Sequence, residues 1–106
     1  MTMEMLGGLI YGLLQKGEEN GITQSEISQI IGLEKREVRR AIAQLRDDGK
    51  VIIASNSGYY LPTDDDAGVV AVRRFIAMME AQAKSRYLSV KSAERWLAEF
   101  NQESFT

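Results

Sequence analysis

Two short amphipathic segments joined by a single glycine constrain the fold of this 106-residue chain more than any other feature. Thr23 and Glu26 have the spacing of a capping box, so a short helix is expected to begin there and to end at Gly32. A second helix is predicted over 34–48, and Gly49 closes it. Its apolar residues recur every three to four positions, as one buried face requires, and they are Val38, Ala41, Ile42 and Leu45. The pattern therefore predicts two short helices that meet at a tight turn.

A hairpin pattern follows the second helix directly. Residues 51–53 and 59–61 are rich in β-branched and aromatic side chains and predict two strands around a polar turn, with Pro62 as the stop. A further helix is expected earlier in the chain, because the apolar residues of the segment 6–14 follow helical spacing. The order helix, helix, tight turn, helix and hairpin predicts a winged helix-turn-helix domain over 1–62, in a mainly α fold with a small β-hairpin.

The segment 63–106 is predicted to be a C-terminal helical extension with an apolar seam. It contains no proline and no glycine after Gly68, and its apolar residues keep one heptad register that only Arg86 interrupts with a charge. The part 64–102 is either one long helix or two helices that fold back near 85–89. The seam is predicted to mediate a homodimer, and the alternative is that it packs on the winged domain. The predicted dimerisation residues are Val69, Val72, Ile76, Met79, Ala83, Val90, Leu97 and Phe100.

The predicted helix at 34–48 carries a cluster of cations opposite its apolar face. Between Lys35 and Arg40 four of six residues are Lys or Arg, and Glu37 is the only acid among them. Arginine pairs bidentately with guanine or with phosphate, and the N-terminal half of such a helix enters the major groove in helix-turn-helix proteins. The alternative is that these are the ordinary solvated charges of a surface helix. The predicted contact residues for double-stranded DNA are Lys35, Arg36, Arg39, Arg40, Lys50, Ser55, Asn56, Ser57, Thr23 and Gln24.

Several runs of the sequence resemble the winged helix of the biotin-repressor family. They are Thr23 to Ile27, Gly32-Leu33, Val38 to Ile42, Leu45 to Gly49, and Gly58 to Pro62. The resemblance covers residues 6–62 and implies that 34–48 is the recognition helix and 51–61 the wing. No ligase domain follows in this sequence, so the biotin chemistry of that family is not expected here. The turn of the wing holds no Lys or Arg, in departure from the family's pattern, and so adds little charge attraction for phosphates.

The charge balance limits how strongly one copy of the chain can bind DNA. The formal net charge is −2, and the segment 24–62 holds six Lys or Arg against five Asp or Glu. A single copy is therefore expected to bind weakly, and a dimer would double its contacts. The predicted function is DNA binding, as a transcription regulator or a small phage or plasmid DNA-handling protein. The competing interpretation is a winged-helix module for protein–protein interaction in a larger assembly, without direct DNA contact.

The composition argues against catalysis and metal binding. The chain has no cysteine and no histidine, so thiolate and imidazole metal ligands and the usual nucleophile–base pairs are missing. The carboxylates of 64–66 are the one cluster considered for Mg²⁺, and a helix start explains all three better. The N-terminus lacks the pattern of a signal peptide, and no apolar run is long enough for a membrane helix. A cytoplasmic non-enzyme without cofactor or small-molecule ligand is expected.

Overall fold

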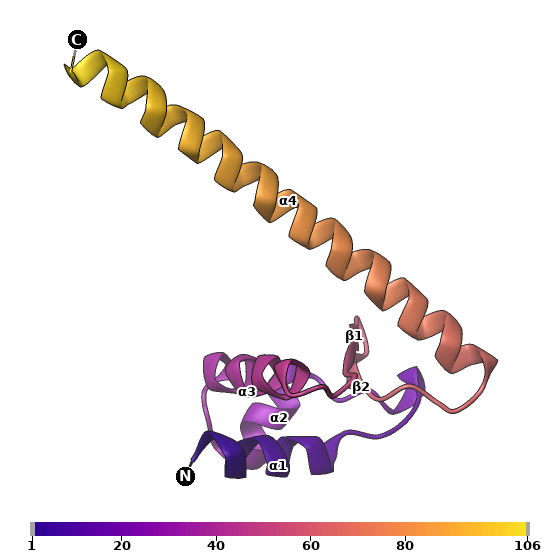
Figure 1. Cartoon of the computed structure of the whole chain (residues 1–106). Helices are drawn as coiled ribbons and strands as arrows, with labels where there is room; N and C mark the ends of the chain where they lie inside the picture. The colour runs from indigo at the N-terminus through magenta and orange to yellow at the C-terminus, as the bar shows by residue number, and fades with distance from the viewer. Residues whose placement is uncertain (1, 106) are drawn as a thin grey trace. The chain divides into compact units, whose positions relative to one another are not determined.

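The computed structural model describes residues 2–105, with side chains as far as Phe100. Met1 and Thr106, the last residue of the predicted C-terminal extension, lie outside the described residues. The chain divides into two compact units, 1–73 and 74–106. The elements in chain order are α1 (Met3–Leu13), the short 3₁₀-helix η1 (Glu18–Asn20), α2 (Gln24–Ile31), α3 (Lys35–Asp47), β1 (Ile53–Ser55), β2 (Gly58–Tyr60) and α4 (Asp66–Phe105) (Figure 1). A mainly helical chain with a small hairpin after three helices is the predicted fold class, and it is confirmed.

The core of the first unit lies among α1, α2 and α3, which Figure 1 shows grouped together, with α3 packed against both other helices. Gly7, which is buried, faces the side chain of Leu45 where α1 packs on α3. The side chain of Ile52, from the segment between α3 and β1, completes the core. The buried apolar residues of this cluster are Leu6, Ile10, Leu14, Ile27, Val38, Ala41, Ile42, Leu45 and Ile52.

The helix-turn-helix forms by the local rules that its sequence predicts. The backbone N–H of Glu26 donates to Oγ1 of Thr23 at 3.1 Å, and the N–H of Thr23 donates to Oε1 of Glu26 at 3.2 Å, so the capping box is confirmed. Gly32 ends α2 in the left-handed conformation, at φ 77°, and its N–H donates to the carbonyl of Ser28. The hydroxyl of Ser28 donates to the carbonyl of Leu33 and so closes the turn before α3.

The hairpin is real, but the predicted bounds of its strands are wrong by up to two residues. Strand β1 begins at Ile53, not at 51, because in this register Val51 would face Pro62, which has no N–H to donate to the ladder. The carbonyl of Ile52, just before β1, accepts two hydrogen bonds from Arg46, from Nε at 3.0 Å and Nη2 at 2.7 Å. Strand β2 pairs with β1 in antiparallel register, with Ser55 opposite Gly58, and it ends at Tyr60. Leu61 lies beyond β2 and exchanges its backbone hydrogen bonds with Gln15 and Gly17 instead.

The outer edge of β2 is also occupied. Ile22, just before α2, exchanges two backbone hydrogen bonds with Tyr59, at 2.7 and 3.0 Å. The hairpin is therefore fixed to the loop that leads into α2, and it is held at a defined place beside the helix-turn-helix.

Replacing Gly58 by alanine is expected to destabilise the first unit strongly. Gly58 has φ 107°, and a Cβ there would lie 2.3 Å from the carbonyl oxygen of Ile22, so both the backbone and its neighbour must shift. Strain of this kind together with the overlap should cost about 3 kcal/mol in the free energy of unfolding. Gly32→Ala is the matched control, because Gly32 also has positive φ but open space around it, and it should cost only about 1 kcal/mol. Urea denaturation measures both, and equal losses would contradict the packing assigned to Gly58.

Helix α4 is one continuous helix from Asp66 to Phe105, so the chain does not fold back near 85–89. Asp65 caps its start by accepting from the N–H of Gly68 at 3.0 Å. Gly68 is needed there, because a Cβ would overlap the carbonyl oxygen of Thr63. No helix of the described part is long and apolar enough to cross a membrane.

Candidate nucleic-acid interface

The rotation of α3 about its own axis is set by its buried face. Val38, Ala41 and Ile42 are almost completely buried against α1 and α2, as the sequence pattern predicts. Helical geometry then turns the side chains between and opposite them outward. The four cations placed on this outer side are all exposed, and they are Lys35, Arg36, Arg39 and Arg40.

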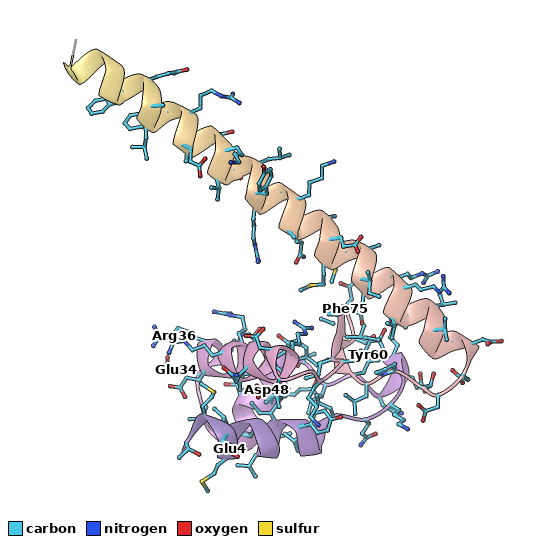
Figure 2. The ribbon with its side chains drawn as sticks, in the orientation of Figure 1. Glu4, Glu34, Arg36, Asp48, Tyr60 and Phe75 are labelled. Carbon is cyan, nitrogen blue, oxygen red and sulfur yellow. The ribbon has the colours of Figure 1, made fainter. Side chains whose placement is uncertain are left out.

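Most of these cations have no carboxylate partner among the residues whose side chains are described. Arg36 lies 3.9 Å from Oε2 of Glu34, and Figure 2 shows the pair together at the start of α3. For Lys35, Arg39 and Arg40 no ion pair occurs within the described part of the chain. The spacing also sets Lys35 beside Arg39 and Arg36 beside Arg40, one helical turn apart, where like charges repel. The cluster is thus electrostatically unsatisfied in the isolated chain, and an anion bound at the outer side of α3 would relieve the repulsion.

A second group of predicted contact residues lines a shallow groove between the start of α2 and the hairpin. The groove has a volume of about 280 Å³. Two predicted residues from α2 and its cap, Thr23 and Gln24, meet two from the hairpin there, although about 30 residues of chain separate the two pairs. The groove is lined by Thr23, Gln24, Ala54, Ser55, Asn56, Gly58 and Tyr59. Ser57 is exposed at the tip of the hairpin and does not line the groove.

The residues of this groove differ in what they can still bind. The hydroxyl hydrogen of Thr23 is already used, because it is donated to Oε1 of Glu26 at 2.9 Å, while the oxygen accepts from the N–H of Glu26. Ser55 accepts a hydrogen bond from the N–H of Ser57 at 3.1 Å, which leaves its own hydroxyl hydrogen available to donate. Thr23 therefore serves the helix cap first, while Ser55, Asn56 and Gln24 offer the polar groups that a phosphate oxygen requires.

Two further cations near α3 are engaged by aromatic rings. Lys50, one of the predicted contact residues, holds its Nζ 5.1 Å from the centre of the Tyr11 ring, so its side chain lies against α1. Arg46 lies 6.0 Å from the ring centre of Tyr59 and donates to the carbonyl of Ile52. Burial lowers the pKa of the Arg46 guanidinium from its ordinary value, although the side chain remains cationic near neutral pH. Arg46 is thus a structural residue, which the charge count of the sequence could not reveal.

Two carboxylates of the acidic cluster 64–66 have partners within the chain. No group of three or more potential metal ligands occurs among the described residues. Asp64 forms an ion pair with Lys16, a contact that the helix-start interpretation did not include, and it raises the pKa of that lysine. Asp65 is the capping residue, and hydrogen bonds from the Thr63 hydroxyl and from the N–H of Gly68 hold the pKa of its carboxyl below the ordinary value.

The predicted dimerisation residues lie along α4 with their apolar side chains largely in solvent. Ile76 is 49% exposed, Leu97 52% and Phe100 50%, while Val72 is half-buried. Trp96 and Phe100 stack with ring centres 5.1 Å apart. A continuous helix therefore presents the predicted seam, and within the second unit nothing covers the described part of it.

Comparison with known proteins agrees with this architecture. No curated protein and no solved structure matches the chain. Residues 9–60, however, match the family model of the helix-turn-helix (HTH) domain. The match begins within α1 and ends with the last residue of β2, so it includes both helices of the motif and the hairpin. Residues 9–60 therefore belong to the helix-turn-helix domain family, and the hairpin after the third helix makes this domain a winged helix-turn-helix of the DNA-binding class.

Proposed function

We propose that this protein binds double-stranded DNA by inserting the N-terminal half of α3 into the major groove. The observation that carries the proposal is the row of exposed cations on α3, three of which have no ion-pair partner in the described part of the chain. Arg36, Arg39 and Arg40 approach the bases, where arginine reads guanine O6 and N7, and Lys35 binds phosphate. The family match supports DNA as the ligand of this face.

The groove between α2 and the hairpin supplies the second contact in this proposal. It holds neutral donors, including the hydroxyl of Ser55 and the amides of Gln24 and Asn56, and no cation of the described residues lines it. Such groups position a protein on the DNA backbone without adding much charge attraction. In Figure 2, Arg36 lies at the end of α3 remote from the hairpin. The base contacts would therefore be made at one end of α3, and the contacts of the groove with the DNA backbone nearer its other end.

The full binding unit in this proposal is a homodimer joined through α4. One domain offers few cations, and two domains held together double the phosphate contacts and raise the effective concentration of the second domain. The exposed seam of α4 supports this step, since most of its apolar side chains from Ile76 to Phe100 are otherwise left in water. We place the dimer in the cytoplasm as a non-enzymatic transcription regulator or a small phage or plasmid DNA-handling protein without cofactor.

Fluorescence anisotropy with a labelled random duplex, measured from about 25 to about 300 mM salt, tests the proposal. The logarithm of the association constant should fall linearly with the logarithm of the salt concentration, with a slope of roughly −0.9 for each phosphate contact. On a random duplex, which offers no specific base contacts, all four cations of each of two domains contact phosphates, so eight contacts predict a slope of about −7. Absence of binding at the lowest salt concentration would contradict DNA binding.

A protein-interaction module is the second candidate, and one exposed side chain favours it. Ile30 on α2 is 61% exposed, on the same helix-turn-helix that would face DNA. An apolar side chain at this place fits a protein partner better than a phosphate backbone. The anisotropy experiment separates the two candidates, because a purely protein-binding module gives no salt-dependent binding of DNA.

A further inference from the structure

The apolar seam of α4 is long enough to specify how two copies of the chain pair. Its ten positions run from Val69 to Phe100 on one continuous helix, a length of about 47 Å at 1.5 Å per residue. In heptad terms the first row is Val69, Ile76, Ala83, Val90 and Leu97, and the second row is Val72, Met79, Arg86, Ala93 and Phe100. The two possible directions of the second helix bring different residues together, so they can be compared residue by residue.

A parallel pair is disfavoured by charge. In that arrangement each seam residue faces the same residue of the second copy, so the two Arg86 side chains meet in one apolar layer. The flanking positions offer no compensation, because Arg73, Glu80 and Glu94 would all face uncharged residues across the interface. A parallel dimer would therefore bury like charges and gain no ion pair between the helices.

We propose that α4 forms an antiparallel homodimer whose centre of symmetry lies between Lys84 and Ser85. In this register every seam position meets a seam position of the other row, so none is left without a partner. Bulky side chains oppose smaller ones in most layers, as dense packing requires. The layers, each present twice, are Val69 with Phe100, Val72 with Leu97, Ile76 with Ala93, Met79 with Val90, and Ala83 with Arg86.

The charged residues of α4 fit the same register. Arg86 lies opposite the small side chain of Ala83 of the second copy, so the two Arg86 side chains fall in adjacent layers, about 4.5 Å apart along the axis at 1.5 Å per residue, and not in one layer. The alanine leaves room for the aliphatic stem of each and lets its guanidinium reach solvent. On the flank of the seam Arg73 comes beside Glu94 of the second copy, and symmetry produces this opposite-charge pair twice. Among the described residues of the single chain, Glu94 pairs with the exposed Lys91 at 3.4 Å, and such a surface pair is easily exchanged.

The antiparallel direction has a consequence for the DNA that the dimer binds, and this part rests on the proposed function. The two winged domains join α4 at Asp66 of each copy, and these two points lie about 55 Å apart along the paired helices at 1.5 Å per residue. A parallel pair would bring both domains to one end, where half-sites one helical turn apart fit. The antiparallel dimer instead reads half-sites about 16 base pairs apart or more, or two separate duplexes, at 3.4 Å per base pair.

Disulfide cross-linking tests the direction, because the chain has no cysteine of its own. Val72→Cys protein mixed with Leu97→Cys protein of different tag length should give a mixed disulfide under mild oxidation, since these positions share a layer. Leu97→Cys alone should give none, because the two copies of residue 97 lie about 37 Å apart. Ala81→Cys, on the outer side of α4, is the control that reports random collision. A disulfide from Leu97→Cys alone, without the mixed product, would overturn the proposal in favour of a parallel pair.

A charge exchange gives an independent measurement that needs no oxidation. Arg73→Glu and Glu94→Arg should each weaken the dimer roughly fivefold or more in sedimentation equilibrium, since each sets like charges together twice. The double variant should recover the affinity, while Arg74→Glu, on the outer side, should change little. Failure of the double variant to recover would contradict the register. Both experiments are done without DNA, so their outcome is separate from that of DNA binding.

Discussion

Replacing Arg39 and Arg40 together by alanine is expected to lower the affinity for DNA by more than about a hundredfold, because the dimer loses four arginines that each contribute about 1–3 kcal/mol at a base or phosphate. Both side chains are exposed and have no ion-pair partner in the described part of the chain, so no ion pair within the protein is lost. The free energy of unfolding should stay the same or rise slightly, because the repulsion between Lys35 and Arg39 and between Arg36 and Arg40 is removed. Anisotropy and urea denaturation on the same samples check both expectations.

The control for this variant is Arg74→Ala with Arg95→Ala. It removes the same number of positive charges from exposed positions of α4 that lie outside the seam. Comparison of the two double variants therefore separates the effect of the position of the arginines on α3 from the effect of net charge. We expect a loss of affinity of less than about threefold. An equal loss in both double variants would mean that DNA responds to overall charge and that α3 is not the recognition element.

Replacing Ile76 by aspartate is expected to abolish the dimer at micromolar concentration. Burial of one isoleucine contributes about 1.5–3 kcal/mol, and symmetry removes two of them while it introduces two unpaired charges into the seam. The dissociation constant should rise by more than about a hundredfold, at about 1.4 kcal/mol per factor of ten. DNA affinity should fall with it, because each domain then binds alone.

Ala81→Asp is the matched control, since Ala81 is exposed on the opposite side of the same helix. It should leave both the dimer and DNA binding unchanged, as surface substitutions away from packing do. Sedimentation equilibrium of the two variants measures their dimer dissociation constants and so tests whether the seam is the interface. If the unsubstituted chain is itself monomeric at high concentration, the seam is not an interface between copies and the two-domain account of affinity fails.

The helix-turn-helix could be predicted from the sequence because its determinants are local. The capping box of Thr23 and Glu26 spans four residues, Gly32 ends α2 by its own conformational freedom, and the rotation of α3 follows from the spacing of Val38 and Ile42. The exposed position of the α3 cations follows from the same spacing. The family match over 9–60 confirms the predicted helix-turn-helix.

The features that the sequence could not supply depend on residues outside the local pattern. The side chain of Arg46 is turned back onto the carbonyl of Ile52, just before β1. Asp64 pairs with Lys16, 48 residues away, and not with the start of α4. Lys50 lies over Tyr11, which belongs to α1. Helical spacing and turn chemistry carry no information on such contacts, so they appear only once the tertiary structure is known.

Backbone amide chemical shifts, followed by NMR during titration with a short duplex, locate the DNA on the surface of the protein. We expect the largest changes at Lys35 to Arg40 of α3, with smaller changes around Gln24, Ser55 and Asn56, and none along the outer side of α4. Every amide is observed at once, so the measurement locates the DNA without assuming where it binds. Changes confined to other surfaces, or no changes at low salt with the first unit folded, would contradict the claim that α3 of this winged helix-turn-helix reads DNA.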